Sequence, residues 1–449
     1  MKRNTSQIYS SILAAAISLA LAPVAQAADL LSVYRQAIDY DAQFAGARAT
    51  LEAGREKLPQ GLAGLLPFIS GSVNTTWNEN DLTKKKGIGA GTSASTSYNS
   101  NSWNVALTQP LFRWQNWVSY NQAELAVGLA ETQFVLAQQD LMLRVSSAYF
   151  DTLLAEDVLS TAKAQRVAFA ETLESAKRNF EVGTATITDS HEAQAKYDLA
   201  TAQLAGAEND LAVKRYALQV LVGKDVASLK RLGSGVALSR PQPENIDKWV
   251  EMAQTNSFGV QVSAGQLEIA NREIERQRAG HLPTLDFVAN HGSRMDNPSL
   301  NVPTGIQTDI TTYALQLSVP LFAGGAVSSR DREAVALKDK AQTDLDNARR
   351  SAAQAARTAF LGVTSGLSQV KAFEAAMTSS QSALDSNKLG YEVGVRINID
   401  VLNAQSQLYD TRAKLAKARL DTLLALLKLK AATGALSEAD LASVNSSLE

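Results

Sequence analysis

The residue types that most often carry enzyme chemistry are few and scattered in this sequence. The chain has no cysteine, and its three histidines, His191, His281 and His291, lack the spacing of metal ligands. It contains no Gly-x-Ser-x-Gly motif and no Walker motif. The Gly-Ile-Gly-Ala-Gly run at 87–91 lies in a polar segment with no helix start behind it, which favours a flexible linker over a phosphate-binding loop. We therefore expect no enzymatic activity, no cofactor and no metal site.

A repeated motif contains the carboxylates with the most regular placement. Residues 179–198 read NFEVGTATITDSHEAQAKYD, and residues 390–409 read GYEVGVRINIDVLNAQSQLY. Both contain Glu-Val-Gly, an aspartate six residues after the glycine, and Ala-Gln. The same helix–turn–helix pattern is therefore predicted twice.

The duplication extends along most of the chain. Pro110-Leu111-Phe112 recurs as Pro320-Leu321-Phe322, at the same offset of about 210 residues. The first repeat is predicted over 28–240 and the second, of the same order, over 244–440. Two peripheral segments are predicted over 223–247 and 433–449.

Long helices must position the repeated motif. Proline is absent from 111–240 and 321–449, and apolar residues there recur at heptad spacing among many small residues. Helices are predicted over about 28–58, 113–182, 187–222, 245–280, 323–393 and 398–432. The two longest would be on the order of 100 Å long, which fits an ordinary globular bundle poorly. Two shorter helices placed end to end could run beside each long one.

Two alternating segments precede the long helix in each repeat. Apolar and polar residues alternate over 68–77, 102–109, 284–291 and 313–319, which predicts strands with one apolar face. The intervening polar segments, 78–101 and 292–311, are interpreted as outer loops. A soluble, half-buried sheet is the alternative.

Four strands leave two open edges, which a bilayer does not tolerate. If the strands span a membrane, the chain must associate with copies of itself. Two copies would give an eight-stranded barrel with a filled lumen, and three would give twelve strands and a passage.

The N-terminus has the pattern of an export signal. Lys2 and Arg3 precede a short apolar run at 12–24, and Ala25-Gln26-Ala27 has the form of a cleavage site, so residues 1–27 are predicted to be a signal peptide. Lys and Arg number 43 against 45 Asp and Glu, so nucleic acid is not an expected partner.

Four motifs together resemble the TolC family of outer-membrane efflux and type I secretion channels: the two Glu-Val-Gly turns, Gly-His-Leu-Pro-Thr-Leu-Asp at 280–286, and Pro-Leu-Phe-Ala-Gly-Gly at 320–325. The resemblance implies a mixed α and β membrane protein, a homotrimer whose twelve-stranded barrel in outer-membrane lipid continues into a periplasmic α-helical barrel. It implies a passive exit channel in the outer membrane, opened by a periplasmic adaptor and an inner-membrane ABC or proton-driven pump. A periplasmic coiled-coil adaptor or scaffold with a small β-domain is the alternative.

The resemblance also assigns roles to the repeated turns. Val182-Gly183-Thr184 and Val393-Gly394-Val395 correspond to the periplasmic tips that adaptors contact. Each glycine is expected in the left-handed conformation that a tight reversal requires.

The closed state of the family is held by hydrogen bonds between tip helices. By this resemblance, Tyr391 and Arg396 would bond to Thr188 and Asp189. A further Gln–Glu pair of the family is replaced here by Thr172 and Lys388, so that part of the latch is not expected.

The pore aperture of the family carries two successive rings of acidic residues. Asp400 matches the first ring, but the second position is Asn403. The resemblance therefore implies three carboxylates at the aperture instead of six, and weaker cation binding.

Overall fold

The computed structural model describes residues 27–85, 87–88, 91–226, 228–233, 238–298 and 304–449. The predicted signal peptide lies outside these residues, except for its last position, Ala27.

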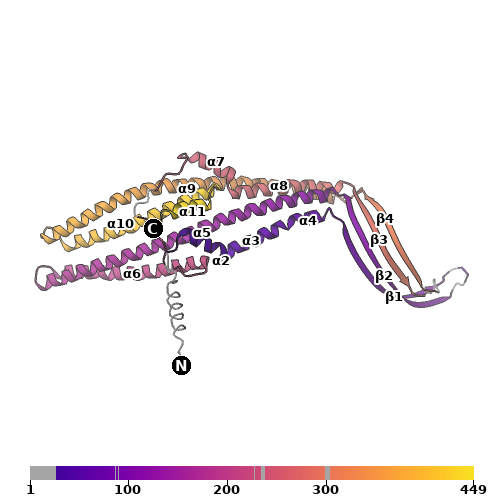
Figure 1. Cartoon of the computed structure of the whole chain (residues 1–449), viewed down its shortest axis with the longest axis horizontal. Coiled ribbons are helices and arrows are strands. Elements are labelled where there is room, and N and C mark those ends of the chain that lie inside the picture. The colour runs from indigo at the N-terminus through magenta and orange to yellow at the C-terminus, as the bar shows by residue number, and fades with distance from the viewer. Residues whose placement is uncertain (1–26, 86, 89–90, 227, 234–237, 299–303) are drawn as a thin grey trace, which may run out of the picture. The chain divides into compact units, whose positions relative to one another are not determined.

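Helices and strands alternate twice along the described residues (Figure 1). The elements of the first half are α2 (Leu30–Tyr40), α3 (Ala42–Arg55), α4 (Lys57–Ala63), β1 (Phe68–Thr83), β2 (Ser93–Phe112), α5 (Trp114–Glu181) and α6 (Ile187–Val222). Those of the second half are α7 (Ile246–Asn256), α8 (Phe258–Arg278), η1 (Ala279–His281), β3 (Thr284–Asp296), β4 (Ile306–Ser318), α9 (Ala326–Glu392), α10 (Asn398–Ala432) and α11 (Glu438–Asn445).

The helix predictions are confirmed, with breaks in two of them. α6 and α10 have the predicted bounds, and α5 and α9 are long helices of 68 and 67 residues. The helix predicted over 28–58 is divided among α2, α3 and α4, and that over 245–280 is divided between α7 and α8. None of the described helices is both long enough and apolar enough to cross a membrane.

The chain divides into two compact units, and α3, α5 and α9 contribute to both. The described parts of 1–47, 136–257 and 350–449 form the first unit, which holds α2, α6, α7, α10 and α11. Residues 48–135 and 258–349 form the second unit, which holds α4, α8 and the sheet.

Buried polar contacts hold the first unit together where helices begin and end. Asp41, between α2 and α3, accepts a hydrogen bond from the Phe44 backbone N–H (2.7 Å) and caps α3. Its carboxylate also accepts two hydrogen bonds from Arg144 of α5, at 2.9 and 3.0 Å. Tyr149, also on α5, donates to the carbonyls of Ala28 (3.2 Å) and Lys230 (2.9 Å), so α5 fixes the start of the described chain and the segment between the repeats.

In the second unit, four antiparallel strands form one sheet in the order β1-β2-β3-β4. The strands have 16, 20, 13 and 13 residues and are longer than predicted. The expectation that 78–101 and 292–311 are loops is therefore wrong for most of their length. Serine, threonine and asparagine occupy both faces there, so no alternation of apolar residues marked these positions as strand.

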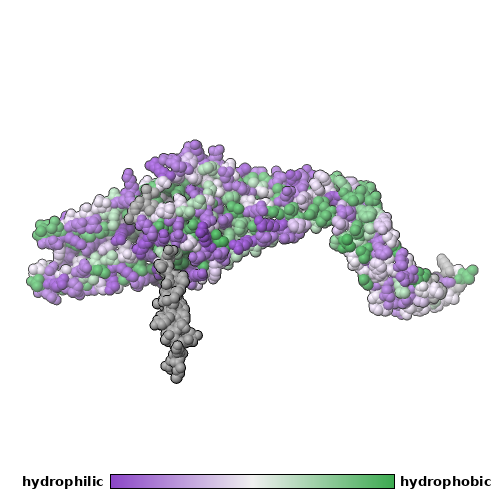
Figure 2. All heavy atoms as spheres, viewed as in Figure 1, coloured by the Kyte–Doolittle hydropathy of each residue, from purple (hydrophilic) through white to green (hydrophobic). Residues whose placement is uncertain are grey.

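The register places the predicted apolar positions of all four strands on one face. Ile69 pairs with Leu107, Leu107 with Ala289, and Ala289 with Tyr313. Ile69 and Tyr313 are 63% and 75% exposed in the single chain. Figure 2 shows hydrophobic surface where the strands meet the helices and a paler, more hydrophilic surface toward the strand loops. The predicted apolar face is thus confined to the helix-proximal part of the sheet.

An ion pair joins the sheet to the start of α5. Arg113 donates to both carboxylate oxygens of Asp286 on β3, at 2.8 and 2.6 Å, and the Asp286 side chain is 8% exposed. Such a bidentate contact fixes direction as well as distance. It therefore sets the angle at which the chain leaves β2 and enters the long helix.

Candidate functional site

Two turns of the same kind connect the long helices of the first unit to their partners. The first tip, 182–186, joins α5 to α6, and the second tip, 393–397, joins α9 to α10. Gly183 and Gly394 have φ values of 76° and 80°, which confirms the left-handed conformation predicted for both. Two backbone hydrogen bonds after each glycine return to the same carbonyl, that of residue 179 in the first tip and that of residue 390 in the second.

Apolar side chains stand exposed on both tips. The most exposed are Val182 at 73%, Val393 at 64%, Val395 at 75% and Ile397 at 61%. Figure 2 shows hydrophobic surface at the ends of both helical pairs. Contiguous exposed apolar surface marks a candidate site of contact with another protein.

Two hydrogen bonds join the tips within one chain. The Asn179 amide donates to the Tyr391 hydroxyl (3.2 Å). The Asn398 amide, on a residue only 2% exposed, donates to the Asp189 carbonyl (3.4 Å). Sequence reasoning did not find Asn179 or Asn398, since their partners lie more than 200 positions away.

The residues expected to form the latch have other partners in the single chain. The Asp189 carboxylate accepts hydrogen bonds from the N–H and hydroxyl of Thr186, at 2.9 and 2.7 Å, and so caps α6. Arg396 lies beside Asp400, with 3.6 Å between Nη1 and Oδ2. Thr188 is exposed. The predicted contacts of Tyr391 and Arg396 with Thr188 and Asp189 are not among those of one chain, and they stay a prediction.

The two residues at the positions of the second latch pair, Thr172 and Lys388, share no hydrogen bond in the described chain. Thr172 donates to the Ala168 carbonyl of its own helix (3.0 Å), and Lys388 is exposed on α9.

Asp400 and Asn403 line an open groove between α9 and α10. The groove has a volume of about 580 Å³, and its lining is mostly polar, including Ser379, Ser380 and Asn387. The Asp400 side chain is 35% exposed and Asn403 is exposed. Both predicted aperture residues therefore face accessible space within the chain.

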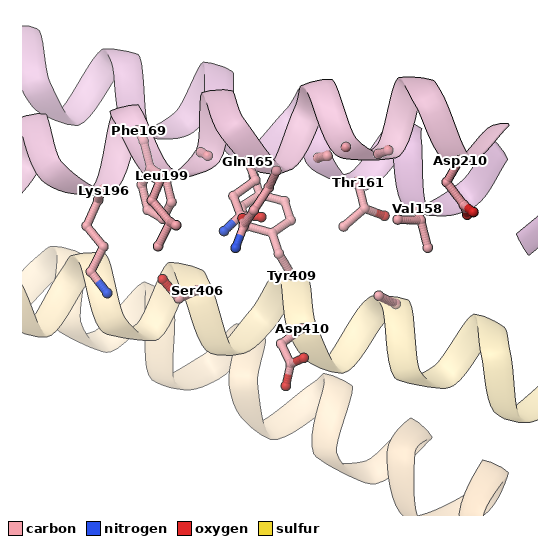
Figure 3. Close-up of a pocket in the computed structure, with 16 residues that line it drawn as sticks. Val158, Thr161, Gln165, Phe169, Lys196, Leu199, Asp210, Ser406, Tyr409 and Asp410 are labelled. Atoms are coloured by element: carbon pink, nitrogen blue, oxygen red, sulfur yellow. The ribbon is translucent and has the colours of Figure 1, made fainter. Parts of the chain in front are cut away.

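A second groove, which sequence reasoning missed, lies between α10 and the α5–α6 pair (Figure 3). It encloses about 620 Å³, with Phe169, Leu199 and Tyr409 among its lining side chains. Its polar members include Lys196 of α6 and Asp410 of α10. Three small residues of α6, Ala200, Gly206 and Ala207, also line the groove, and they were the available signal.

Close to this groove, α10 carries a buried polar side chain. Gln405 is 5% exposed, and its Oε1 has no hydrogen-bond partner among the described residues. The neighbouring Leu402 packs with Phe169, Leu173 and Ala193 of the α5–α6 pair. The contact between the helical pairs therefore combines apolar burial with one unsatisfied acceptor.

No group of three or more His, Asp or Glu residues suitable for a metal ion occurs in the part of the chain that the structure describes. The polar contacts of the tips include one partly exposed ion pair, Arg396–Asp400, and hydrogen bonds between side chains and backbone such as that of Asn398 to the Asp189 carbonyl. This arrangement positions one carboxylate beside one guanidinium.

Comparison with known proteins gives a consistent result along the chain. The family model for outer membrane efflux proteins matches residues 33–224 and 249–435. The outer membrane protein TolC of Vibrio cholerae is 31% identical over 94% of this chain and 94% of its own length. The alkaline protease secretion protein AprF of Pseudomonas aeruginosa is 31% identical over 98% of this chain and 90% of its own length.

Solved structures show the same fold at lower identity. The Campylobacter jejuni CmeC outer membrane channel superimposes with a TM-score of 0.78 at 16% identity, covering 93% of this chain and 89% of that one. The outer membrane protein VceC of Vibrio cholerae gives 0.75 at 18% identity, covering 90% and 96%.

Proposed function

Because the chain belongs to the outer membrane efflux protein family and is an outer-membrane channel, we propose that three copies assemble into one passive exit duct. The observation that carries this proposal is the sheet, which has an exposed apolar face across all four strands and two edge strands, β1 and β4. Unpaired edges are not tolerated in lipid, so the edges must pair with those of other copies.

The number of copies follows from the strand count. Eight strands make a barrel that side chains fill, whereas twelve strands leave a passage. A channel therefore requires three copies, with Leu315 and its apolar neighbours against outer-membrane lipid and the opposite face toward the passage.

The helices extend this passage away from the membrane. At 1.5 Å per residue, α5 and α9 are each about 100 Å long. Their tips carry exposed valines in the matched triplets 182–184 and 393–395. We propose that a periplasmic adaptor contacts these tips and that an inner-membrane ABC or proton-driven pump supplies the energy, while the chain itself catalyses nothing.

The gate of this duct is proposed at the second tip. Asp400 from three copies would form a ring of three carboxylates, with Asn403 as a neutral second ring. Arg396 and Tyr391 would close the duct by bonding to Thr188 and Asp189 of tip helices. Both capping hydrogen bonds of Asp189 use Oδ2, so its Oδ1 remains available to accept a hydrogen bond of the latch.

Relatives named for protein secretion and relatives named for efflux both support the proposed exit duct. AprF and PrtF are named for protease secretion and match more than nine-tenths of the chain, and TtgC, named as a probable efflux pump component, matches 66%. The alternative of a periplasmic adaptor or scaffold has no support among these relatives.

A matched pair of charge substitutions tests the proposal. Leu315 lies on the apolar face and is 69% exposed, and its neighbour Gln316 lies on the other face. Lysine at the lipid-facing position should cost about 2–4 kcal/mol near the bilayer midplane. Leu315→Lys should therefore reduce the amount of trimer in outer membranes, while Gln316→Lys should leave it near the wild-type amount. A wild-type protein that stays monomeric and dissolved without detergent would refute the proposal.

A further inference from the structure

The two tips have the same backbone but differ at two positions that face each other. Residue 179 of the first tip is Asn and residue 185 is Ala, whereas the matching residues of the second tip are Gly390 and Arg396. The larger side chain therefore lies at the start of the first turn and at the end of the second. This exchange suggests that only one large side chain fits at this place.

The geometry of the second tip gives the reason. A Cβ placed on Gly390 would lie 2.7 Å from Cγ of Arg396 and 3.3 Å from its Cβ. Real Cβ contacts are not that short, so the Arg396 side chain lies across the space that a larger residue would fill. Gly390 is buried within α9, and its φ is not positive. Its backbone therefore does not require glycine, and alanine would form a better helix.

Arg396 is held from both ends in this position. Its backbone N–H donates to the Gly390 carbonyl (3.0 Å). Its guanidinium lies 3.6 Å from Asp400, and the Arg396 side chain is 59% exposed. The stem thus crosses Gly390 and the charged end reaches the carboxylate.

The start of α10 leaves that carboxylate available. The matching residue of the first tip, Asp189, belongs to a capping box with Thr186. In the second tip the N-cap is Ile397, which makes no side-chain cap hydrogen bond. Asp400 is therefore paired with Arg396, whereas its counterpart Asp189 is paired with the N-cap residue Thr186.

We propose that Gly390 is a positioning residue, whose missing side chain allows Arg396 to lie beside Asp400 and reduce the negative charge there. This inference rests on the proposed function, in which Asp400 lines the aperture. Arg396 then has two alternative sets of partners: Asp400 in the first turn of the following helix, α10, and the latch residues of α6. When the latch opens, the guanidinium returns to Asp400, and the open aperture binds cations less tightly than a bare carboxylate ring would.

Block of single channels by a divalent cation in planar bilayers tests this role. Arg396→Ala should tighten block about twofold, as expected for loss of a partly exposed ion pair. Gly390→Ala should shift block in the same direction. Gly362→Ala is the matched control, because a Cβ there meets only Ala425 at an ordinary 3.5 Å, and it should leave block unchanged.

The double variant decides whether Gly390 acts through Arg396. Arg396→Ala removes the Cγ atom that lies 2.7 Å from a Cβ at residue 390, so adding Gly390→Ala to that variant should change block no further. The same cycle measured by thermal midpoint should also be non-additive, and that readout does not depend on the pore. An effect of Gly390→Ala that persists unchanged in the Arg396→Ala background, in both readouts, would overturn the positioning role. If block is unchanged by Arg396→Ala and by Asp400→Ala while the thermal cycle is non-additive, the aperture assignment fails and the positioning role stands.

Discussion

Replacing Asp41 should destabilise the first unit more than any single exposed charge in it. The Asp41 side chain is 7% exposed, caps α3 and binds Arg144 through two hydrogen bonds. Asp41→Ala removes the cap and leaves a largely buried guanidinium with one remaining carboxylate, that of Asp140 at 2.7 Å.

The size of the effect follows from these contacts. Breaking a buried ion pair from one side costs about 3–5 kcal/mol. Since Arg144 keeps Asp140 and its side chain is 26% exposed, we expect the lower end, about 3 kcal/mol with the cap included. For a unit of this size that corresponds to roughly 6–12 °C in Tm. Asp140→Ala is the control, because Asp140 is 48% exposed and should cost about 0.5 kcal/mol.

The assay is thermal unfolding followed by far-UV circular dichroism in detergent, at several pH values. Hydrogen bonds from Arg144 lower the pKa of Asp41 below its ordinary 3.8. A lowered carboxyl pKa stabilises the fold above the unfolded value, and that stabilisation is lost as the pH falls through the folded value. The difference between wild type and Asp41→Ala should therefore be constant at neutral pH and shrink below about pH 4. Equal Tm values for Asp41→Ala and Asp140→Ala at pH 7 would refute the reasoning.

Three further predictions concern the gate and the second unit. Arg396→Ser should raise single-channel conductance in planar bilayers by loosening the latch, and an unchanged conductance would remove the latch assignment. Asp400→Ala should weaken block by divalent or hexammine cations, and equal block would mean that Asp400 does not line the pore. Gly54→Val should lower Tm by overpacking α3 against α5, at a cost of about 1–3 kcal/mol, because a Cβ there would lie 2.4 Å from that of Ala130. Gly46→Val is its control, since nothing lies within 4 Å of a Cβ at that position, and an equal loss in both would contradict the packing argument.

The helices could be predicted closely because their signals are local. The heptad pattern of α6 begins after the capping residue Thr186 and ends at Gly223, which has a φ of 77°. The break at Asp41 was missed because the sequence around it keeps its apolar spacing. What ends α2 is a carboxylate whose main partner, Arg144, lies on another helix, and no local pattern records such a contact.

The tip contacts and the outer parts of the strands could not be predicted for a related reason. Asn179 and Tyr391 belong to different repeats, and nothing in either repeat alone specifies their hydrogen bond. In the outer part of the sheet, Thr75 bonds to Asn99 and Asn101 across the strands at 3.2 and 2.7 Å. These pairs stabilise strands without any apolar alternation, so a method based on hydrophobic period takes them for loops.

The length of β2 has a consequence for the molecules that leave the duct. A lipid bilayer needs about 9–11 residues of a tilted strand, and β2 has 20. In the proposed duct, its polar outer part, which pairs with β1 alone, would extend beyond the lipid as a water-exposed ribbon. A molecule that passes the sheet would leave at the end of this polar ribbon, away from the lipid, where it has less opportunity to enter the membrane.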